Sequence, residues 1–224
     1  MKFERLIKKI LTESDNNIWK NGVWKGETWE DGRWIDGVWK DGIWKNGSWL
    51  KGIWEKGTWE NGVWKDGIWK NGYWKDGFWR NGTWENGTWE KGEWIDGKWL
   101  NGVWKNGEWY KGVWYNGTWE NGKWDSGSWQ KGTWENGIWK SGTWNDGKWK
   151  KGVWKDGTWK AGTWENGTWE YGTWNGGTWK KGNWKKGWIY DPKRLGAFDK
   201  KWEWNDDWVL SPVNPAIYFT PFKK

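Results

Sequence analysis

The sequence contains no cysteine and no histidine. The missing cysteine excludes a disulfide framework, a zinc–thiolate site and a thiol nucleophile. The missing histidine excludes imidazole acid–base chemistry, histidine-based catalytic triads and histidine metal ligands. Aliphatic residues are also scarce, because Leu, Ile, Val and Phe together number 30 of 224 residues. Such a low share indicates disorder only when net charge is high, and 37 basic against 29 acidic residues give only +8.

Long hydrophobic runs are absent as well. Lys8 and Lys9 interrupt the apolar residues near the N-terminus, so we expect no signal peptide, no membrane insertion and synthesis in a cytoplasm. The apolar residues of this segment recur at helical spacing and predict a short amphipathic helix over residues 2–13, within an N-terminal unit of residues 1–16. They are Phe3, Leu6, Ile7, Ile10 and Leu11.

Two residue types dominate what is present, with 38 Trp and 36 Gly. Trp occupies every fifth position from Trp19 to Trp184, which gives 34 units without a slip. Gly lies two residues before Trp in 32 units, and Thr, Val or Ile precedes Trp in 23. The repeat Gly-(Thr/Val/Ile)-Trp-(Lys/Glu)-(Asn/Asp) defines a unit over residues 17–186, and such a period takes priority over local patterns.

The period of five excludes a helix, because successive Trp would be spread around its circumference and Gly would weaken it. An antiparallel meander is also disfavoured. Each strand between two Asn-Gly turns would have three residues, and its first and last residues would point their hydrogen-bonding groups to the same edge, although the two turns lie on opposite edges. One face of such a sheet would also expose its Trp side chains. A β-solenoid with parallel strands has no such conflict. Trp and Gly would then point inward, the residue between them outward, and the Asn or Asp would take the positive φ of a turn.

This pattern resembles the pentapeptide-repeat family, which implies a right-handed, four-sided β-solenoid with a bulky residue at the centre of each unit. Trp and Gly stand here where that family has Leu or Phe and a small Ala-like residue. On four sides, 34 units make about 8.5 coils and a rod roughly 40 Å long. The Trp side chains of every fourth unit would then stack. We choose one such column to represent the core: Trp39, Trp59, Trp79, Trp99, Trp119 and Trp139.

Composition changes abruptly after the repeat. Residues 187–224 hold all four prolines and predict an irregular C-terminal cap or docking tail. Both ends also resemble termini of tailed-bacteriophage virion proteins, and Leu11-Thr12-Glu13 fits the cleavage pattern of T4-like prohead proteases, which implies processing after Glu13. The resemblance implies partner docking through the helix residues given above and through three aromatic residues of the tail, Trp208, Tyr218 and Phe219.

The residues expected on the outside of the solenoid predict no catalytic, metal or nucleic-acid site. No pair of carboxylates is singled out for glycoside hydrolysis, acidic residues are too dispersed for a metal site, and no basic stripe predicts nucleic-acid binding. We expect no cofactor. On a four-sided coil no face carries a continuous Thr ladder, which disfavours binding to ice or another flat lattice. Ile95 and Tyr115 would stack, with neighbours round the corners, in one apolar surface spot of Ile95, Leu100, Tyr110 and Tyr115.

These observations predict a non-enzymatic structural protein, as a phage virion component or decoration that presents a rigid rod and docks to virion or scaffold proteins through its termini. The alternative is an adhesin module whose aromatic side chains bind a receptor or glycan, either through accessible Trp or through the apolar spot. The two differ in whether function depends on the ends or on the side of the rod.

Overall fold

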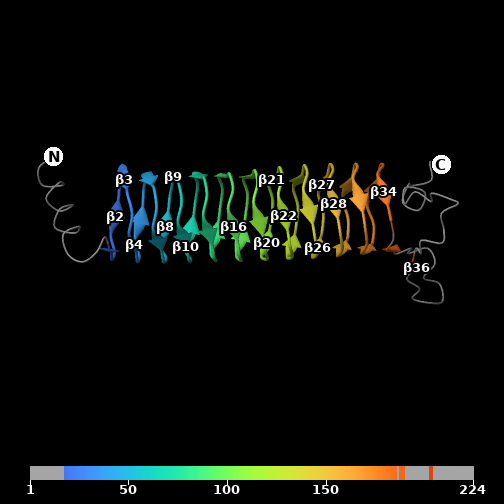
Figure 1. Cartoon of the computed structure of the whole chain (residues 1–224), viewed down its shortest axis with the longest axis horizontal. Coiled ribbons are helices and arrows are strands. Elements are labelled where there is room, and N and C mark those ends of the chain that lie inside the picture. The colour runs from blue at the N-terminus through green and yellow to red at the C-terminus, as the bar shows by residue number, and fades with distance from the viewer. Residues whose placement is uncertain (1–17, 186, 190–201, 204–224) are drawn as a thin grey trace, which may run out of the picture.

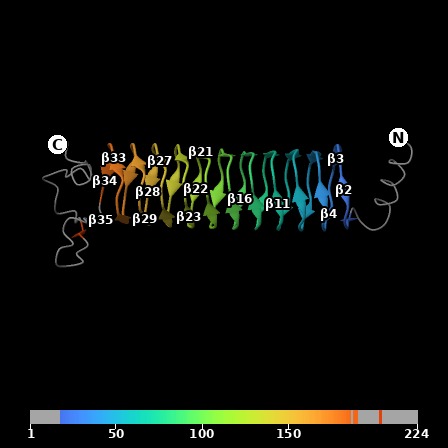
Figure 2. The same cartoon turned by 180° about the vertical axis from the view of Figure 1, so that it is seen from behind.

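The computed structural model describes residues 18–185, 187–189 and 202–203, and these form a straight rod of parallel β-strands (Figures 1 and 2). Three sheets, here called A, B and C, run the length of the rod. Successive parallel strands along the chain enter the three sheets in turn, so each pairs with the parallel strand three places later.

Almost every strand contains two residues, the outward residue and the Trp after it. Sheet A consists of β1 (Ile18–Trp19), β4 (Arg33–Trp34), β7 (Ser48–Trp49), β10 (Val63–Trp64), β13 (Phe78–Trp79), β16 (Glu93–Trp94), β19 (Glu108–Trp109), β22 (Lys123–Trp124), β25 (Ile138–Trp139), β28 (Val153–Trp154), β31 (Thr168–Trp169) and β34 (Asn183–Trp184).

Sheet B follows one unit later along the chain. It consists of β2 (Val23–Trp24), β5 (Val38–Trp39), β8 (Ile53–Trp54), β11 (Ile68–Trp69), β14 (Thr83–Trp84), β17 (Lys98–Trp99), β20 (Val113–Trp114), β23 (Ser128–Trp129), β26 (Thr143–Trp144), β29 (Thr158–Trp159), β32 (Thr173–Trp174), β35 (Trp188–Ile189) and β36 (Trp202–Glu203).

Sheet C completes each coil. It consists of β3 (Glu27–Trp29), β6 (Gly42–Trp44), β9 (Thr58–Trp59), β12 (Tyr73–Trp74), β15 (Thr88–Trp89), β18 (Val103–Trp104), β21 (Thr118–Trp119), β24 (Thr133–Trp134), β27 (Lys148–Trp149), β30 (Thr163–Trp164) and β33 (Thr178–Trp179).

The solenoid is three-sided, so the expectation of four sides was wrong. The parallel register joins residues 15 apart, as in Trp99↔Trp114, rather than 20 apart. Three units therefore close one coil, and the repeat makes about 11 coils. At ~4.8 Å per coil the rod is roughly 50 Å long, not 40 Å. The hand of the coil stays a prediction.

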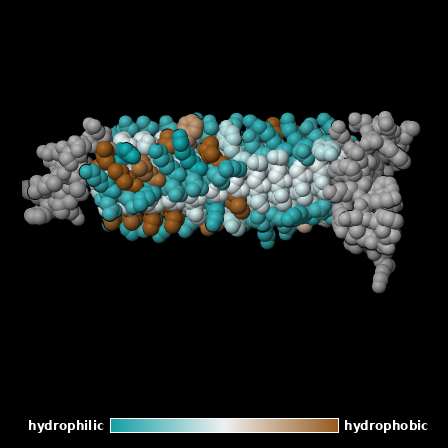
Figure 3. All heavy atoms as spheres, turned by 90° about the horizontal axis from the view of Figure 1, so that it is seen from below, coloured by the Kyte–Doolittle hydropathy of each residue, from teal (hydrophilic) through white to brown (hydrophobic). Residues whose placement is uncertain are grey.

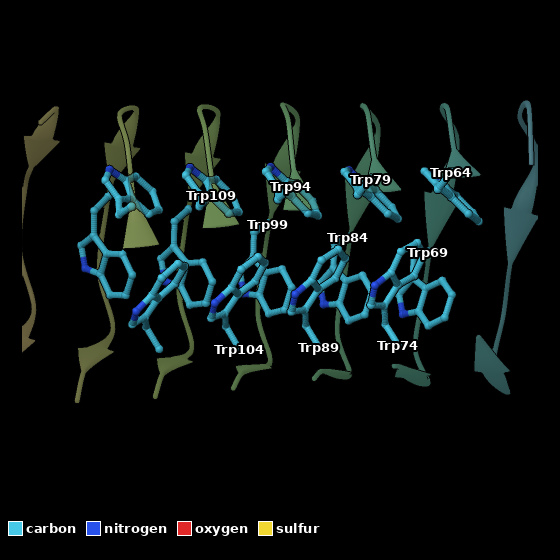
Figure 4. Packing of buried hydrophobic residues seen from close by; sticks show 14 of the residues in the cluster. Trp64, Trp69, Trp74, Trp79, Trp84, Trp89, Trp94, Trp99, Trp104 and Trp109 are labelled. Carbon is cyan, nitrogen blue, oxygen red and sulfur yellow. The ribbon is translucent and has the colours of Figure 1, made fainter. Parts of the chain in front are cut away.

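The core consists of Trp side chains alone. From Trp34 to Trp174 the repeat Trp are fully buried. Within each sheet the indoles form a parallel column, as for Trp84 and Trp99, whose ring centroids are 4.8 Å apart at 6°. Within a coil they meet edge to face, as for Trp94 and Trp99 at 6.0 Å and 73° (Figure 4). Each such pair contributes about 0.5–1.5 kcal/mol beyond burial.

Three indoles per layer explain the three sides. The six Trp chosen above as a single column are all buried, but they are distributed over the three sheets. Each stacks on the Trp of the coil before it and the coil after it, as Trp79 does on Trp64 and Trp94. Edge-to-face contacts between neighbouring sheets then fill the triangular interior.

The repeat glycine is required by the backbone. Gly97 has φ +125°, and a Cβ there would lie 2.5 Å from the carbonyl oxygen of Gly82 in the preceding coil. Only Gly combines that φ with so close an approach between coils. The expectation that Asp or Asn would take the positive φ was wrong, since it falls on the Gly that follows.

Asp and Asn before the glycine serve the corner in another way. Asp36 accepts a hydrogen bond from the Gly37 N–H at 2.7 Å, and Asp96 does the same for Gly97 at 2.7 Å. Backbone bonds between coils complete the ladder, as from Val38 N–H to Gly22 O at 2.8 Å and from Lys40 N–H to Trp24 O at 2.8 Å. The corner is thus fixed by local side-chain acceptors and by the preceding coil.

The described rod continues slightly past the predicted boundary at residue 186. Strand β35 adds to sheet B in parallel and places Ile189 at the register of the core Trp174. Strand β36 then pairs antiparallel to β35, with Trp188 opposite Glu203. The antiparallel strand occupies the C-terminal edge of sheet B, where another parallel coil would otherwise add. The predicted N-terminal helix lies outside the described residues.

Candidate functional site: the faces and corners of the rod

The three-sided register decides which outward residues are neighbours. We call the outward surfaces of the sheets face A, face B and face C. Each corner is named for the two faces that it joins: corner AB follows the Trp of sheet A, corner BC that of sheet B and corner CA that of sheet C. Residues 15 apart form a column along the rod axis.

Corner CA carries only acidic and basic residues immediately after Trp. The column contains Glu30, Lys45, Glu60, Lys75, Glu90, Lys105, Glu120, Glu135, Lys150, Glu165 and Lys180. Neighbouring coils pair along it, as in Glu60–Lys75 at 2.9 Å and Glu135–Lys150 at 2.7 Å. With one exception, Lys148–Glu165, the ion pairs found in the described residues join positions 15 apart.

Face B is the most apolar face in the N-terminal half. Four consecutive coils present an aliphatic residue there: Val23, Val38, Ile53 and Ile68. Val23 is 60% exposed and Ile68 37%. The space-filling view in Figure 3 shows apolar residues gathered over the N-terminal half of the rod and a paler band over the C-terminal half.

The predicted apolar spot is rearranged by the three-sided coil. Ile95 and Tyr115 do not stack; instead Ile95 stacks with Tyr110 on corner AB, and Leu100 stacks with Tyr115 on corner BC. The two pairs therefore border the same two coils of face B, where Lys98 and Val113 lie between them. Of the four, Leu100 (36%) and Tyr115 (42%) are the most exposed.

All six apolar residues that directly follow Trp in the repeat border face B. Ile35, Leu50, Ile95 and Tyr110 are on corner AB, and Leu100 and Tyr115 are on corner BC. Because face B is opposite corner CA in a triangular coil, the rod is amphipathic across its width.

Face C is rich in Thr but is interrupted. Thr118 and Thr133 are neighbours, as are Thr163 and Thr178, but Lys148 separates the two pairs and Tyr73 projects from the N-terminal half. Tyr73 donates a hydrogen bond to Glu90, and Lys105 lies 5.6 Å from the centroid of its ring. These bulky side chains break a flat lattice-matching surface.

Two carboxyl groups of the described surface have a lowered pKa. Hydrogen bonds from Lys40 lower the pKa of Glu55, and those from Lys148 and Lys180 lower the pKa of Glu165. A general acid in glycoside hydrolysis requires a carboxyl whose pKa is raised. Hydrogen bonding to Glu90 raises the pKa of Tyr73, which moves that phenol away from reactivity at neutral pH.

A shallow groove of about 530 Å³ lies beside corner CA in the middle of the rod. Asn106, Asn121 and Asn136 line it in one column, and the Asn136 amide donates to the Asn121 carbonyl oxygen at 3.2 Å. In the described part of the chain no three Asp or Glu residues converge as a metal site would require. Nor does the described chain form a helix long and apolar enough to cross a membrane.

Most buried indole N–H groups of the described core find no hydrogen-bond acceptor. Near the C-terminal end, three donate to a carbonyl oxygen of the following coil: Trp149 to Asn166 at 3.1 Å, Trp159 to Gly176 at 3.0 Å and Trp164 to Lys181 at 3.1 Å. The nitrogens of the stacked indoles in Figure 4 face the same way within each column. Stacking and the backbone ladder, rather than the indole N–H groups, therefore hold the core together.

The predicted docking residues lie outside the described residues. These are Phe3, Leu6, Ile7, Ile10, Leu11, Trp208, Tyr218 and Phe219, and the predicted processing site at Leu11 and Glu13 lies outside as well.

Comparison with known proteins assigns no family. No protein-family model and no curated protein matches the chain. Among solved structures, the chain is similar to a protein from Desulfovibrio desulfuricans G20 that is named only provisionally as an acetyltransferase. That match has 4% identity and a TM-score of 0.15, and it covers 69% of this chain and 65% of the other. A TM-score this low supports no argument about function.

Proposed function

We propose that the chain is a non-enzymatic structural rod that sets a fixed distance between components of a larger assembly. The observation that supports this best is the uniform core, in which one Trp column per sheet continues through every coil from Trp34 to Trp174 without a gap. Such a core gives length and stiffness and needs no catalytic cleft. The specific assembly that we propose is a phage virion, where the rod would be a component or decoration attached through its termini.

Deletion of whole coils tests the spacer function. Removing residues 98–142 joins Gly97 to Thr143 and deletes three whole coils, so each remaining column keeps its face. We expect a folded rod about 14 Å shorter. Within the assembly, the spacing between the joined components should shrink by the same amount, as measured by electron microscopy. Unchanged spacing would contradict the spacer function.

Deletion of the ends tests the anchoring. Variants that lack residues 1–13 or 205–224 should keep the blue-shifted Trp fluorescence of the folded rod and lose particle association. The control is Lys150→Ala on corner CA, which changes the side of the rod and leaves both ends intact. Equal incorporation of the truncated and full-length chains would refute anchoring through the termini.

A second candidate function is an adhesin module that binds a glycan or receptor. The supporting observation is that Tyr115 and Leu100 adjoin an amide ladder on corner BC, where Asn116 donates to Asn101 and Asn101 to Asn86, both at 3.4 Å. An exposed aromatic ring beside planar amides suits a sugar ring and its hydroxyls. Leu100→Asp combined with Tyr115→Asp should then abolish binding on a glycan array, whereas Ile95→Asp on corner AB should leave it intact. A glycan signal that survives both substitutions would exclude this site.

A further inference from the structure

The amphipathic cross-section of the rod leaves face B as an unpartnered apolar sheet face. Its aliphatic column covers four coils from Val23 to Ile68, and Thr83 and Lys98 separate this column from Val113 and the two stacked corner pairs. Single exposed apolar residues also occur elsewhere in the described repeat, as Ile43 on face C and Ile138 on face A. Within the described rod only face B has an aliphatic column of four consecutive coils, with Ile35 and Leu50 beside it on corner AB. Leu100 and Tyr115 lie on its other bordering corner further along the rod, and exposed apolar residues gathered in this way mark an interaction surface.

We propose that face B binds face B of a second copy of this chain, with the two rods side by side, parallel and in register. A two-fold axis parallel to the rods generates this pair, so the contact is isologous. Under that symmetry, corner AB of one copy lies against corner BC of the other. Residues five apart in the same coil then become partners across the interface.

The sequence is self-complementary under this symmetry in the middle of the rod. Ile95 of one copy meets Leu100 of the other, and Tyr110 meets Tyr115, so both apolar corner pairs are matched twice. One coil earlier Arg80 meets Glu85, which are of opposite charge. The apolar pair on corner AB and the apolar pair on corner BC therefore lie in the same two coils. Binding of a second copy requires this coincidence, whereas binding of an unrelated partner does not.

The area of the face decides between parallel and antiparallel pairing. An antiparallel pair centred on Val38 and Ile53 would overlap over only four or five coils. The parallel pair overlaps over the whole rod, and roughly 50 Å by about 15 Å gives about 750 Å² per copy, close to a standard protein interface. Like charges meet at three corner pairs, Lys20–Lys25, Lys65–Lys70 and Lys155–Lys160, and Lys98 on face B lies opposite its own copy, so we expect a dimer of micromolar rather than nanomolar affinity.

Sedimentation equilibrium on the full chain tests this proposal. We expect dimers at about 100 µM, and Ile53→Glu combined with Ile68→Glu should raise the dimer dissociation constant at least ~100-fold. The matched controls are Ile43→Glu on face C and Ile138→Glu on face A, which change the same residue type at similar exposure and should leave dimerisation intact. Trp fluorescence checks that each variant is folded, because all four side chains point away from the core.

Crosslinking tests the parallel register. Because the chain has no cysteine, Ile95→Cys and Leu100→Cys can be made separately and treated with a short bis-maleimide. We expect neither single variant alone to crosslink, since its two thiols lie on opposite sides of the dimer, and a 1:1 mixture to give a covalent dimer. Crosslinking of the Ile95→Cys variant alone would overturn the parallel arrangement.

A chain that stays monomeric at that concentration would overturn self-association through face B, as would a dimer that persists in the Ile53→Glu, Ile68→Glu variant. These results are separate from the spacer function, which depends on rod length and ends. They are also separate from the adhesin alternative, since Ile53 and Ile68 are remote from Tyr115.

Discussion

Substitution of one repeat glycine by alanine tests how the coils are held together. Gly97 has φ +125°, and an added Cβ would lie 2.5 Å from Gly82 O and 3.1 Å from Gly82 N. The backbone strain alone costs about 1–3 kcal/mol, and the shift of the neighbouring coil adds about 1–3 kcal/mol. We therefore expect Gly97→Ala to lower the free energy of unfolding by about 2–6 kcal/mol.

Two other glycines provide matched controls. Gly26 has φ +73°, but nothing lies within 4 Å of a Cβ there, so Gly26→Ala should show the conformational cost alone, about 1–2 kcal/mol. Gly176 lacks the positive φ, and its Cβ would make only an ordinary contact at 3.4 Å with Lys160 O. Gly176→Ala should be neutral or stabilise the rod by about 0.4–1 kcal/mol, because it restricts the unfolded chain.

Guanidinium unfolding followed by Trp fluorescence measures this series. With a guanidinium m-value of about 5 kcal/mol/M, a loss of about 3 kcal/mol lowers the midpoint by about 0.6 M. The predicted order of stability is Gly176→Ala, then Gly26→Ala, then Gly97→Ala. If the Gly97→Ala and Gly176→Ala variants share one unfolding midpoint, the close approach between coils is not what requires glycine, and the reasoning is refuted.

Three further predictions address the core, the corners and the ion pairs. Native Trp fluorescence should be blue-shifted and poorly quenched by acrylamide, because the core indoles are fully buried; red-shifted and readily quenched emission would contradict a closed core. Asp96→Ala should cost about 1 kcal/mol in guanidinium unfolding, because it removes the acceptor of the Gly97 N–H, whereas Asn106→Ala, for which no such bond is found in the described corners, should cost less. Lys40 lowers the pKa of Glu55, and Lys148 lowers that of Glu165. The two carboxylates therefore stabilise the folded rod above about pH 4.5, and this stabilisation is lost as the pH falls through their lowered pKa in the folded state. The difference in melting temperature between the native chain and Glu55→Gln, Glu165→Gln should therefore be small and constant from pH 6 to 8 and close below pH 4; a difference that grows in acid would contradict this.

The inward Trp, the parallel strands and the Gly–Trp unit could be predicted from the sequence because they follow from the local geometry of five residues. The number of sides could not. A unit such as Gly97-Lys98-Trp99 has the same strand and corner residues whether three or four units close a coil. The closure depends on how three indoles meet at 6.0 Å and about 73° in one layer, which is a packing property of Trp that no spacing reveals.

The error in the number of sides carried over to the surface. Ile95 and Tyr115 were expected to stack because a four-sided coil would bring them into one column, and the amphipathic arrangement of corner CA opposite face B was invisible at that period. Once it is known that residues 15 apart are neighbours, the sequence alone shows which apolar residues stack and that charged corner CA lies opposite face B, because every column then consists of residues at a fixed spacing. The amphipathic surface was thus encoded in the repeat and could be found only through the coil period.

The distance between two spin labels tests the three-sided coil most directly. Ile43 and Thr178 are both exposed on face C and lie nine coils apart. At ~4.8 Å per coil, labels on Ile43→Cys and Thr178→Cys should be about 43 Å apart in a double electron–electron resonance measurement. A four-sided coil would place the same two residues fewer than seven coils or about 32 Å apart. A distance near that value would contradict the three-sided rod on which every column, face and corner depends.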